Sequence, residues 1–120
     1  MPCNLPLYLQ VARDLEDSIL SGQWDPGQDI PAIRSLAVRY HVNPSTVQHA
    51  LYLLREENLI DFRQRRSYVT RDTRLIHRRR EEQARSLTSR LCQSLLALGY
   101  TRADILPAFL RIADVPASAR

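Results

Sequence analysis

The sequence has little that would support an extracellular, membrane-spanning or disulfide-stabilised protein. Its two cysteines, Cys3 and Cys92, are too few for a disulfide framework and lack metal-ligand spacing. We interpret Cys92 as a small buried side chain of an apolar helix. No apolar run approaches the roughly 18 residues that a bilayer span requires. The N-terminus also lacks the basic-then-apolar layout of a secretion signal, so we expect a cytoplasmic protein.

The sequence also lacks the motifs of common catalytic and metal sites. His41, His49 and His77 have neither paired metal spacing nor cysteine partners. There is no glycine-rich phosphate loop and no nucleophile elbow. The pairs Glu56-Glu57 and Glu81-Glu82 are adjacent in sequence, so their side chains would diverge on a helix. We therefore predict no catalytic residue, no metal site and no cofactor.

Charge is unevenly distributed along the 120 residues, whose net charge is +4. Residues 1–29 have one arginine and five acids, whereas residues 30–71 have seven arginines and three acids. Residues 73–120 have nine arginines and four acids, and lysine is absent from the whole chain. A segregated basic part indicates an anionic partner, most often a nucleic acid.

The middle of the chain has the pattern of two helices joined by a tight turn. Residues 32–40 predict the first helix. Asn43 is suited to cap the second helix, and Pro44 at its first position has no N–H to leave unpaired. An i, i+3, i+4, i+7 apolar pattern then continues to a predicted end near Asn58; its members are Val47, Ala50, Leu51 and Leu54.

The flanking segments complete a winged helix-turn-helix. A helix is predicted over residues 6–21, and two strands over 59–63 and 67–71 are joined by residues 64–66. A long helix over 73–98 and a shorter one beginning near Thr101 follow. The predicted fold is mainly α with a small β-hairpin, a winged helix-turn-helix followed by a two-helix dimerisation tail. We expect a DNA-binding domain over residues 1–72 and a helical tail over 73–120.

In a helix-turn-helix, the second helix enters the major groove and its first turns face the base edges. Because Val47, Ala50 and Leu51 are required for the core, the polar residues between them remain outside. Glutamine can pair with an adenine edge, and arginines of the hairpin can neutralise phosphates, one of them in the minor groove. The expected DNA contacts are Arg34, Asn43, Ser45, Thr46, Gln48, His49, Arg63, Arg65 and Arg66.

These residues resemble the GntR family of bacterial transcription regulators over residues 5–71. The matching segments include Ile30-Pro31-Ala32-Ile33-Arg34-Ser35-Leu36-Ala37 and Val42-Asn43-Pro44-Ser45-Thr46-Val47. The segment Asn43-Pro44-Ser45-Thr46 and the short tail are similar to the YtrA subfamily, which implies a small dimeric repressor. By this resemblance, Arg34, Ser45, Thr46 and the hairpin tip would contact DNA.

The sequence departs from the family at several positions. The wing usually contains glycines, whereas Gln64-Arg65-Arg66-Ser67 has none and is about one residue shorter. This puts backbone insertion into the minor groove in doubt, and arginine side chains would substitute. His41 stands where a turn glycine is common, so it must accept or avoid a left-handed conformation. Ala32 replaces the usual serine cap.

The tail presents more apolar surface than two helices can bury between themselves. Burying one leucine is worth about 1.5–3 kcal/mol, so we expect this surface to pack against a second copy in a twofold dimer. Such a dimer would match a palindromic operator. The alternative is that both helices fold back on their own domain. The residues expected at the dimer interface are Leu87, Leu91, Leu95, Leu98, Ile105 and Phe109.

The first functional hypothesis is therefore a dimeric, sequence-specific DNA-binding transcription regulator, a repressor of its own or a neighbouring operon. The second is a winged-helix module that binds a protein and no specific DNA. A small helical enzyme or ligand carrier is a third, but the sequence offers no sign of its pocket. A small-molecule effector, the operator and the regulated genes are left open.

Overall fold

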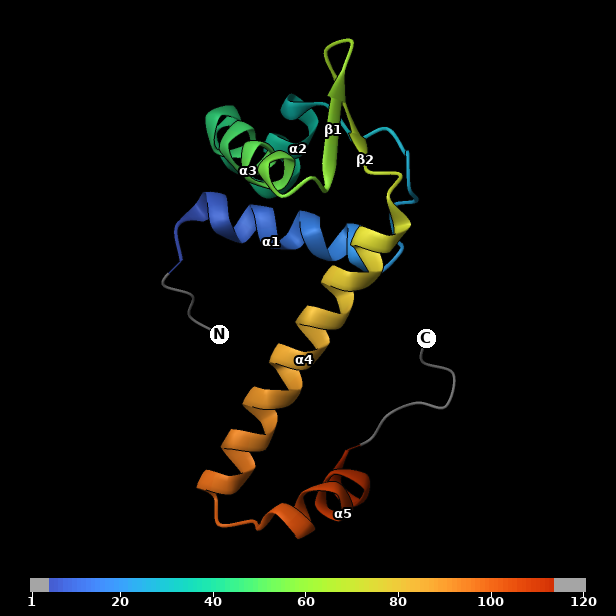
Figure 1. Cartoon of the computed structure of the whole chain (residues 1–120). Coiled ribbons are helices and arrows are strands. Elements are labelled where there is room, and N and C mark those ends of the chain that lie inside the picture. Colours follow the sequence, from blue (N-terminus) through green and yellow to red (C-terminus); the bar gives the residue numbers. More distant parts are fainter. Residues whose placement is uncertain (1–4, 114–120) are drawn as a thin grey trace. The chain divides into compact units, whose positions relative to one another are not determined.

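The computed structural model describes residues 5–113, which form two compact units that divide between Arg80 and Glu81. The first unit has three helices, a hairpin and the start of a fourth helix, and the second has the rest of that helix and a fifth (Figure 1). The elements in chain order are α1 (Leu7–Leu20), α2 (Ile33–Tyr40), α3 (Pro44–Glu56), β1 (Ile60–Arg63), β2 (Arg66–Val69), α4 (Thr73–Ala97) and α5 (Arg102–Ile112).

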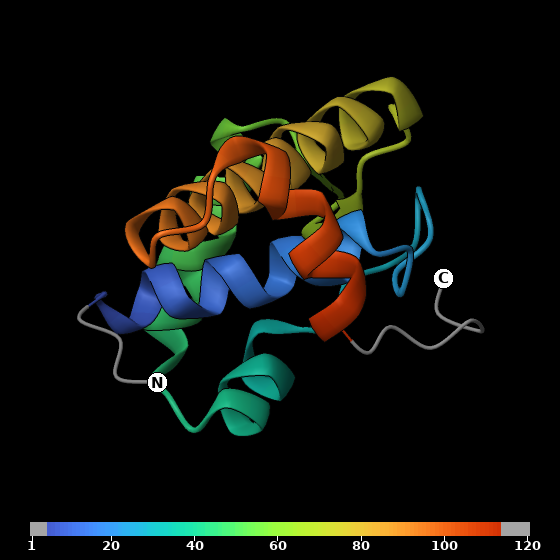
Figure 2. The same ribbon diagram turned by 90° about the horizontal axis from the view of Figure 1, so that it is seen from below.

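The core of the first unit lies where α3 packs on α1 and α2 (Figures 1 and 2). The apolar residues that the sequence pattern assigns to the buried faces are buried there, among them Leu15, Ile19, Leu36 and Val47. Their spacing of three or four residues places them on one face of each helix. This packing fixes α3 and leaves its opposite face outside. The predicted winged helix-turn-helix is confirmed.

The turn between α2 and α3 requires an unusual backbone at His41, whose φ is 55° and ψ is 45°. This left-handed residue ends α2, and the Val42 N–H donates to the Ala37 carbonyl 3.1 Å away. Pro44 begins α3 as predicted. The predicted side-chain cap is wrong, however, because the Asn43 side chain makes no capping hydrogen bond. The Asn43 carbonyl accepts the first helical bonds, and its amide is exposed.

The hairpin is tighter than the sequence predicts. The two antiparallel strands pair from Ile60 with Val69 to Arg63 with Arg66, so the turn consists of Gln64 and Arg65 alone. Both turn residues have positive φ, 50° and 65°, as a type I′ turn requires. The expected three-residue connection is therefore wrong. A two-residue turn follows the right-handed twist of the strands, which favours it even without glycine.

The start of α4 belongs to the first unit. Asp72 caps it, because the Leu75 N–H donates to Asp72 Oδ1 at 3.1 Å. Leu75 and Ile76 are buried in the core of this unit. Arg79 donates to Glu16 of α1 at 2.6 Å and to Glu57 at 2.5 Å. These contacts explain why the compact units divide inside α4 rather than at residue 72.

The second unit contains the rest of α4 and α5. Thr101 and Asp104 interact at the start of α5, where the Thr101 hydroxyl donates to the Asp104 carboxylate at 2.7 Å. The Thr101 side chain accepts no capping bond from a backbone N–H. Cys92 is half-buried rather than buried. In the described part of the chain, no helix is long and apolar enough to cross a membrane. Cys3 and the part of the predicted tail beyond residue 113 lie outside the described residues.

Candidate nucleic-acid interface

The outer face of α3 presents polar side chains at its N-terminal end. Ser45 and Gln48 are exposed and Thr46 is half-buried, whereas Val47 and Ala50 between them are fully buried. The core residues thus fix the rotation of the helix and direct the polar residues outward, as predicted. The positive dipole end of α3 lies at the same place, which favours a phosphate.

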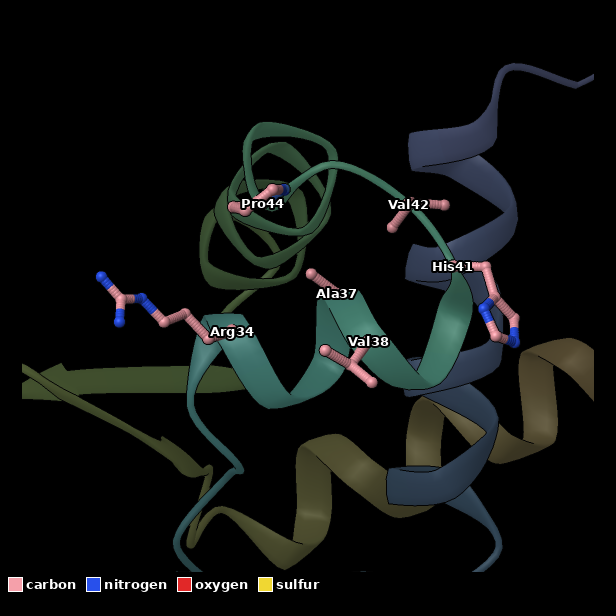
Figure 3. A pocket seen from close by; sticks show the side chains of 6 residues that line it. All are labelled: Arg34, Ala37, Val38, His41, Val42 and Pro44. Atoms are coloured by element: carbon pink, nitrogen blue, oxygen red, sulfur yellow. The ribbon is translucent and has the colours of Figure 1, made fainter.

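Arg34 lies beside this helix end. Its side chain extends outward from the first turn of α2, on the side where α3 begins at Pro44 (Figure 3). His41 is at the other end of α2, away from Arg34 (Figure 3). An open hollow between them is lined by Arg34, Ala37, Val38, His41, Val42 and Pro44. The predicted contacts of α2 and α3 therefore share one surface of the unit.

His49 is exposed but is engaged by another helix. Its ring stacks on Tyr8 of α1, with centroids 3.8 Å apart and an angle of 10° between the planes. Stacking covers one face of the imidazole and leaves its edge available to a ligand. No sequence pattern indicates this pairing, because Tyr8 and His49 are far apart in the chain.

The wing arginines are held in different ways. The Arg63 guanidinium lies over the Tyr68 ring, 5.4 Å from its centroid. Arg65 is at the exposed tip. Arg66 donates to Asp29 at 3.0 Å, and both side chains are more than half exposed, so this pair neutralises the charge only weakly. All three predicted arginines remain on the solvent-facing surface of the hairpin.

Tyr52, Arg55 and Phe62 also belong to this surface and were not predicted from the sequence. Tyr52 and Arg55 follow Gln48 at i+4 and i+7, so these two residues and Gln48 lie in one row along α3. The Arg55 guanidinium lies over the ring of Phe62 in β1, 5.5 Å from its centroid. The helical row was available in the sequence, but the pairing of helix with strand depends on tertiary structure.

Within residues 5–113, no three His, Cys, Asp or Glu side chains are grouped so that they could hold a metal ion. What the first unit does present is an exposed polar helix end flanked by arginines of α2 and of the hairpin. This is the arrangement that duplex DNA requires of a winged helix-turn-helix.

Comparison with known protein families shows which family the chain belongs to. Residues 7–69, more than half of the chain, match the model described as "Bacterial regulatory proteins, gntR family". The chain belongs to the gntR family. It is a regulatory protein with the winged helix-turn-helix architecture of DNA-binding transcription regulators. The resemblance drawn from the sequence is confirmed.

Several curated relatives of this gntR protein match about half of its length. It is 31% identical over 72 residues to the HTH-type transcriptional repressor YtrA of Bacillus subtilis, a match that covers 59% of this chain and 55% of YtrA. It is 38% identical over 60 residues to the uncharacterised regulator YisV of the same organism, covering 50% of this chain but 12% of YisV. The chain therefore spans only a small part of some of the relatives that it matches.

Solved structures extend the likeness. A GntR family transcriptional regulator from Listeria monocytogenes superposes with a TM-score of 0.85 and 26% identity, covering 94% of this chain and all of that one. The DNA-binding domain of AraR in complex with operator ORR3 has a TM-score of 0.54 and 27% identity, covering 58% of this chain and 86% of that one. The Listeria structure thus shares the tail as well as the first unit. The AraR domain matches only 58% of this chain.

Proposed function

We propose that this gntR protein binds a specific duplex operator through the outer face of α3 and the wing. The N-terminal end of α3 enters the major groove, where Gln48 contacts a base edge and Ser45 and Thr46 contact bases or phosphates. Arg34 and the exposed amide of Asn43 bind the adjoining backbone. His49 presents its ring edge to a phosphate, and Arg63, Arg65 and Arg66 contact the phosphates that flank the minor groove.

The observation that carries the proposal is the exposed polar row at the start of a helix whose opposite face is buried. Val47 and Ala50 are fully buried, whereas Ser45 and Gln48 beside them are exposed. A helix with this division has a fixed face available for a ligand. Arginines on both sides of it make the ligand an anion, and the operator complex of the related AraR domain supports a duplex.

We also propose that two copies associate through the tail. Large apolar side chains remain exposed in the second unit; they include Leu87, Leu91, Leu98 and Phe109, while Leu95 and Ile105 are half-buried. Apolar patches of this kind on a small unit mark an interaction site. A twofold dimer would bury the same residues of both copies and would present two α3 helices to a palindromic operator.

The action that we propose is repression in the bacterial cytoplasm, by occupation of a promoter. The repressor YtrA supports this choice, since it is a relative that shares the first unit. Members of a regulator family act by binding rather than by chemistry, and we propose no catalytic residue, cofactor or metal for this chain. Residues 1–72 would bind DNA and residues 73–120 would dimerise.

The DNA-binding proposal is tested by fluorescence anisotropy. An operator is first selected from genomic fragments, and its affinity is compared with that of a scrambled duplex at about 0.15 M salt. We expect at least the roughly 10³-fold preference that specific binding shows. Thr46→Ala and Arg34→Ala should weaken operator binding, whereas Arg90→Ala in the second unit should not. A preference near one for the wild type would instead favour a protein-binding module.

The dimer proposal is tested by analytical ultracentrifugation. The wild type should sediment as a dimer at micromolar concentration, and Leu91→Glu should shift it toward monomer because a buried carboxylate is costly. Gln93→Glu is the matched control, since Gln93 is an exposed polar residue of the same helix. A monomeric wild type would refute the dimer without affecting the DNA-binding proposal.

A further inference from the structure

The wing and α3 enclose a groove that combines three of the predicted DNA contacts with residues that were not predicted to bind DNA. Its lining includes Phe62 and Ser67 of the hairpin, Arg55 of α3, and Arg34, Arg65 and Arg66 at its other end. Two adjoining hollows meet there, and both are lined by Phe62 and Ser67. We call these six residues the wing groove.

Strand register explains why an aromatic ring lines the groove. Ile60 and Phe62 point to the same face of β1, and Ile60 is buried in the core. Phe62 continues this apolar row beyond the core, and its side chain is 50% exposed. Ser67 is paired with it on β2 and is small, which keeps the groove open beside the ring.

The charge of the wing groove indicates which kind of molecule it binds. Four arginines line it, and the acid that lines it is Asp29, which is already paired with Arg66. Arg55 has no ion pair with another described residue, and its guanidinium makes a cation–π contact with Phe62. Positive charge at both ends of the groove, with an apolar ring between, fits a sugar–phosphate strand, in which anionic phosphates alternate with less polar sugars.

The position is also the one that a backbone strand must occupy. When α3 lies in the major groove and the wing reaches the adjacent minor groove, the strand between the two grooves passes between α3 and the hairpin. Resting on the proposed function, we infer that the wing groove holds this strand, with Arg55 as a phosphate contact that Phe62 positions. Arg55 lies about three helical turns beyond Ser45, so it would bind a phosphate outside the set reached from the start of α3.

Each side chain has a separate role in this site. The Arg55 guanidinium donates hydrogen bonds to a phosphate oxygen. The Phe62 ring orients that guanidinium before DNA arrives, which reduces the freedom lost on binding. The contact is to the backbone, so it adds affinity for any duplex and no sequence preference.

Fluorescence anisotropy, which gives the affinity for a duplex at several salt concentrations, tests the inference. The variants are Arg55→Ala, Arg55→Lys and Phe62→Leu, and Arg13→Ala is the control, because it removes the same charge from an exposed site of α1 outside the groove. Each variant is compared with the wild type on a selected operator and on a scrambled duplex. Thermal unfolding by circular dichroism confirms that every variant is folded.

Arg55→Ala should reduce the log–log slope of affinity against salt by about 0.9 for each phosphate that is no longer neutralised, and Arg13→Ala by much less. Both duplexes should lose affinity by the same factor. Arg55→Lys should keep most of the slope because the charge remains. Phe62→Leu should weaken binding in the wild type but change it less than twofold when Arg55 is already alanine, because the ring acts through that guanidinium.

Equal slopes for Arg55→Ala and Arg13→Ala would overturn the inference. A loss of affinity confined to the operator would also overturn it, since that would make Arg55 a base contact. These results are distinct from failure of the proposed function, in which the wild type itself would not prefer the operator.

Discussion

The ring of His49, on the outer face of α3, stacks on the ring of Tyr8 in the first turns of α1, with centroids 3.8 Å apart. The N-terminal part of α1 therefore supports the helix that we propose to enter the major groove. The pair lies on the surface, because His49 is exposed and Tyr8 is half-buried. It links two helices that also share the core.

Removing this stack should cost a modest amount of stability. Aromatic pairs contribute about 0.5–1.5 kcal/mol beyond area burial, and the exposure of His49 places this one at the lower end. We expect Tyr8→Ala and His49→Ala each to lower the urea midpoint, and the double variant to be less destabilised than the sum by about 0.5 kcal/mol. Strict additivity in this double-mutant cycle would show that the rings do not interact in solution.

The contact of Arg79 with Glu16 and Glu57 predicts a larger effect. The Glu16 side chain is 10% exposed, so Arg79→Ala would leave a nearly buried carboxylate without its partner. Breaking such a contact costs about 1–3 kcal/mol, less than in a fully buried pair because the Arg79 side chain is 24% exposed. Chemical denaturation should record this decrease in stability. Arg78→Ala, at the exposed preceding position, should change stability by no more than about 0.5 kcal/mol.

Unfolding measured at alkaline pH should reveal the raised pKa of Tyr40. Burial, and then the hydrogen bond that its hydroxyl donates to Asp14, raise the Tyr40 pKa to about 12. An unfolded tyrosine titrates near pH 10, so the native state holds this proton more tightly. The stabilisation is fully present below about pH 10 and is lost as pH rises through about 12.

The wild type should therefore lose more stability than Tyr40→Phe between pH 10 and 12. Unfolding in urea at a series of pH values measures this difference. The comparison also removes the contribution of Tyr52, whose pKa is raised mainly by its hydrogen bond to Glu56 and which is present in both proteins. Parallel pH profiles for the two proteins would contradict the assigned cause.

The local parts of the fold were predictable from the sequence. Apolar spacing located all the helices, and Pro44 marked the start of α3 because proline suits the first helical position. The exposed polar positions of α3 followed from its buried ones, since a helix has one rotation about its axis once its core face is fixed.

The parts that depend on contacts between distant residues were not predictable. Nothing in the sequence pairs Arg55 with Phe62 or His49 with Tyr8, because each pairing depends on how a helix packs against another element. The predicted side-chain cap at Asn43 is wrong although asparagine is a favoured cap residue. The N–H groups of Thr46 and Val47 donate to the Asn43 carbonyl instead of its side chain. Residue preference allowed the side-chain cap but did not enforce it.

The turn of the wing gives a prediction in which stability and DNA binding change in opposite directions. Gln64 and Arg65 both have positive φ, a conformation that costs residues other than glycine roughly 1–2 kcal/mol. Arg65→Gly removes this cost at one position, so thermal unfolding should shift upward by several degrees. Arg65→Asn, which tolerates the same backbone, should shift it upward by less.

Both variants also remove the charge at the wing tip. If Arg65 binds a phosphate, each variant should bind a duplex more weakly despite its greater stability, and its salt slope should be smaller by about 0.9. A more stable Arg65→Gly protein with unchanged salt dependence would mean that the tip charge does not reach the DNA. The strained turn would then serve only to hold the two strands in register, and the phosphate contacts of the wing would have to come from Arg63 and Arg66.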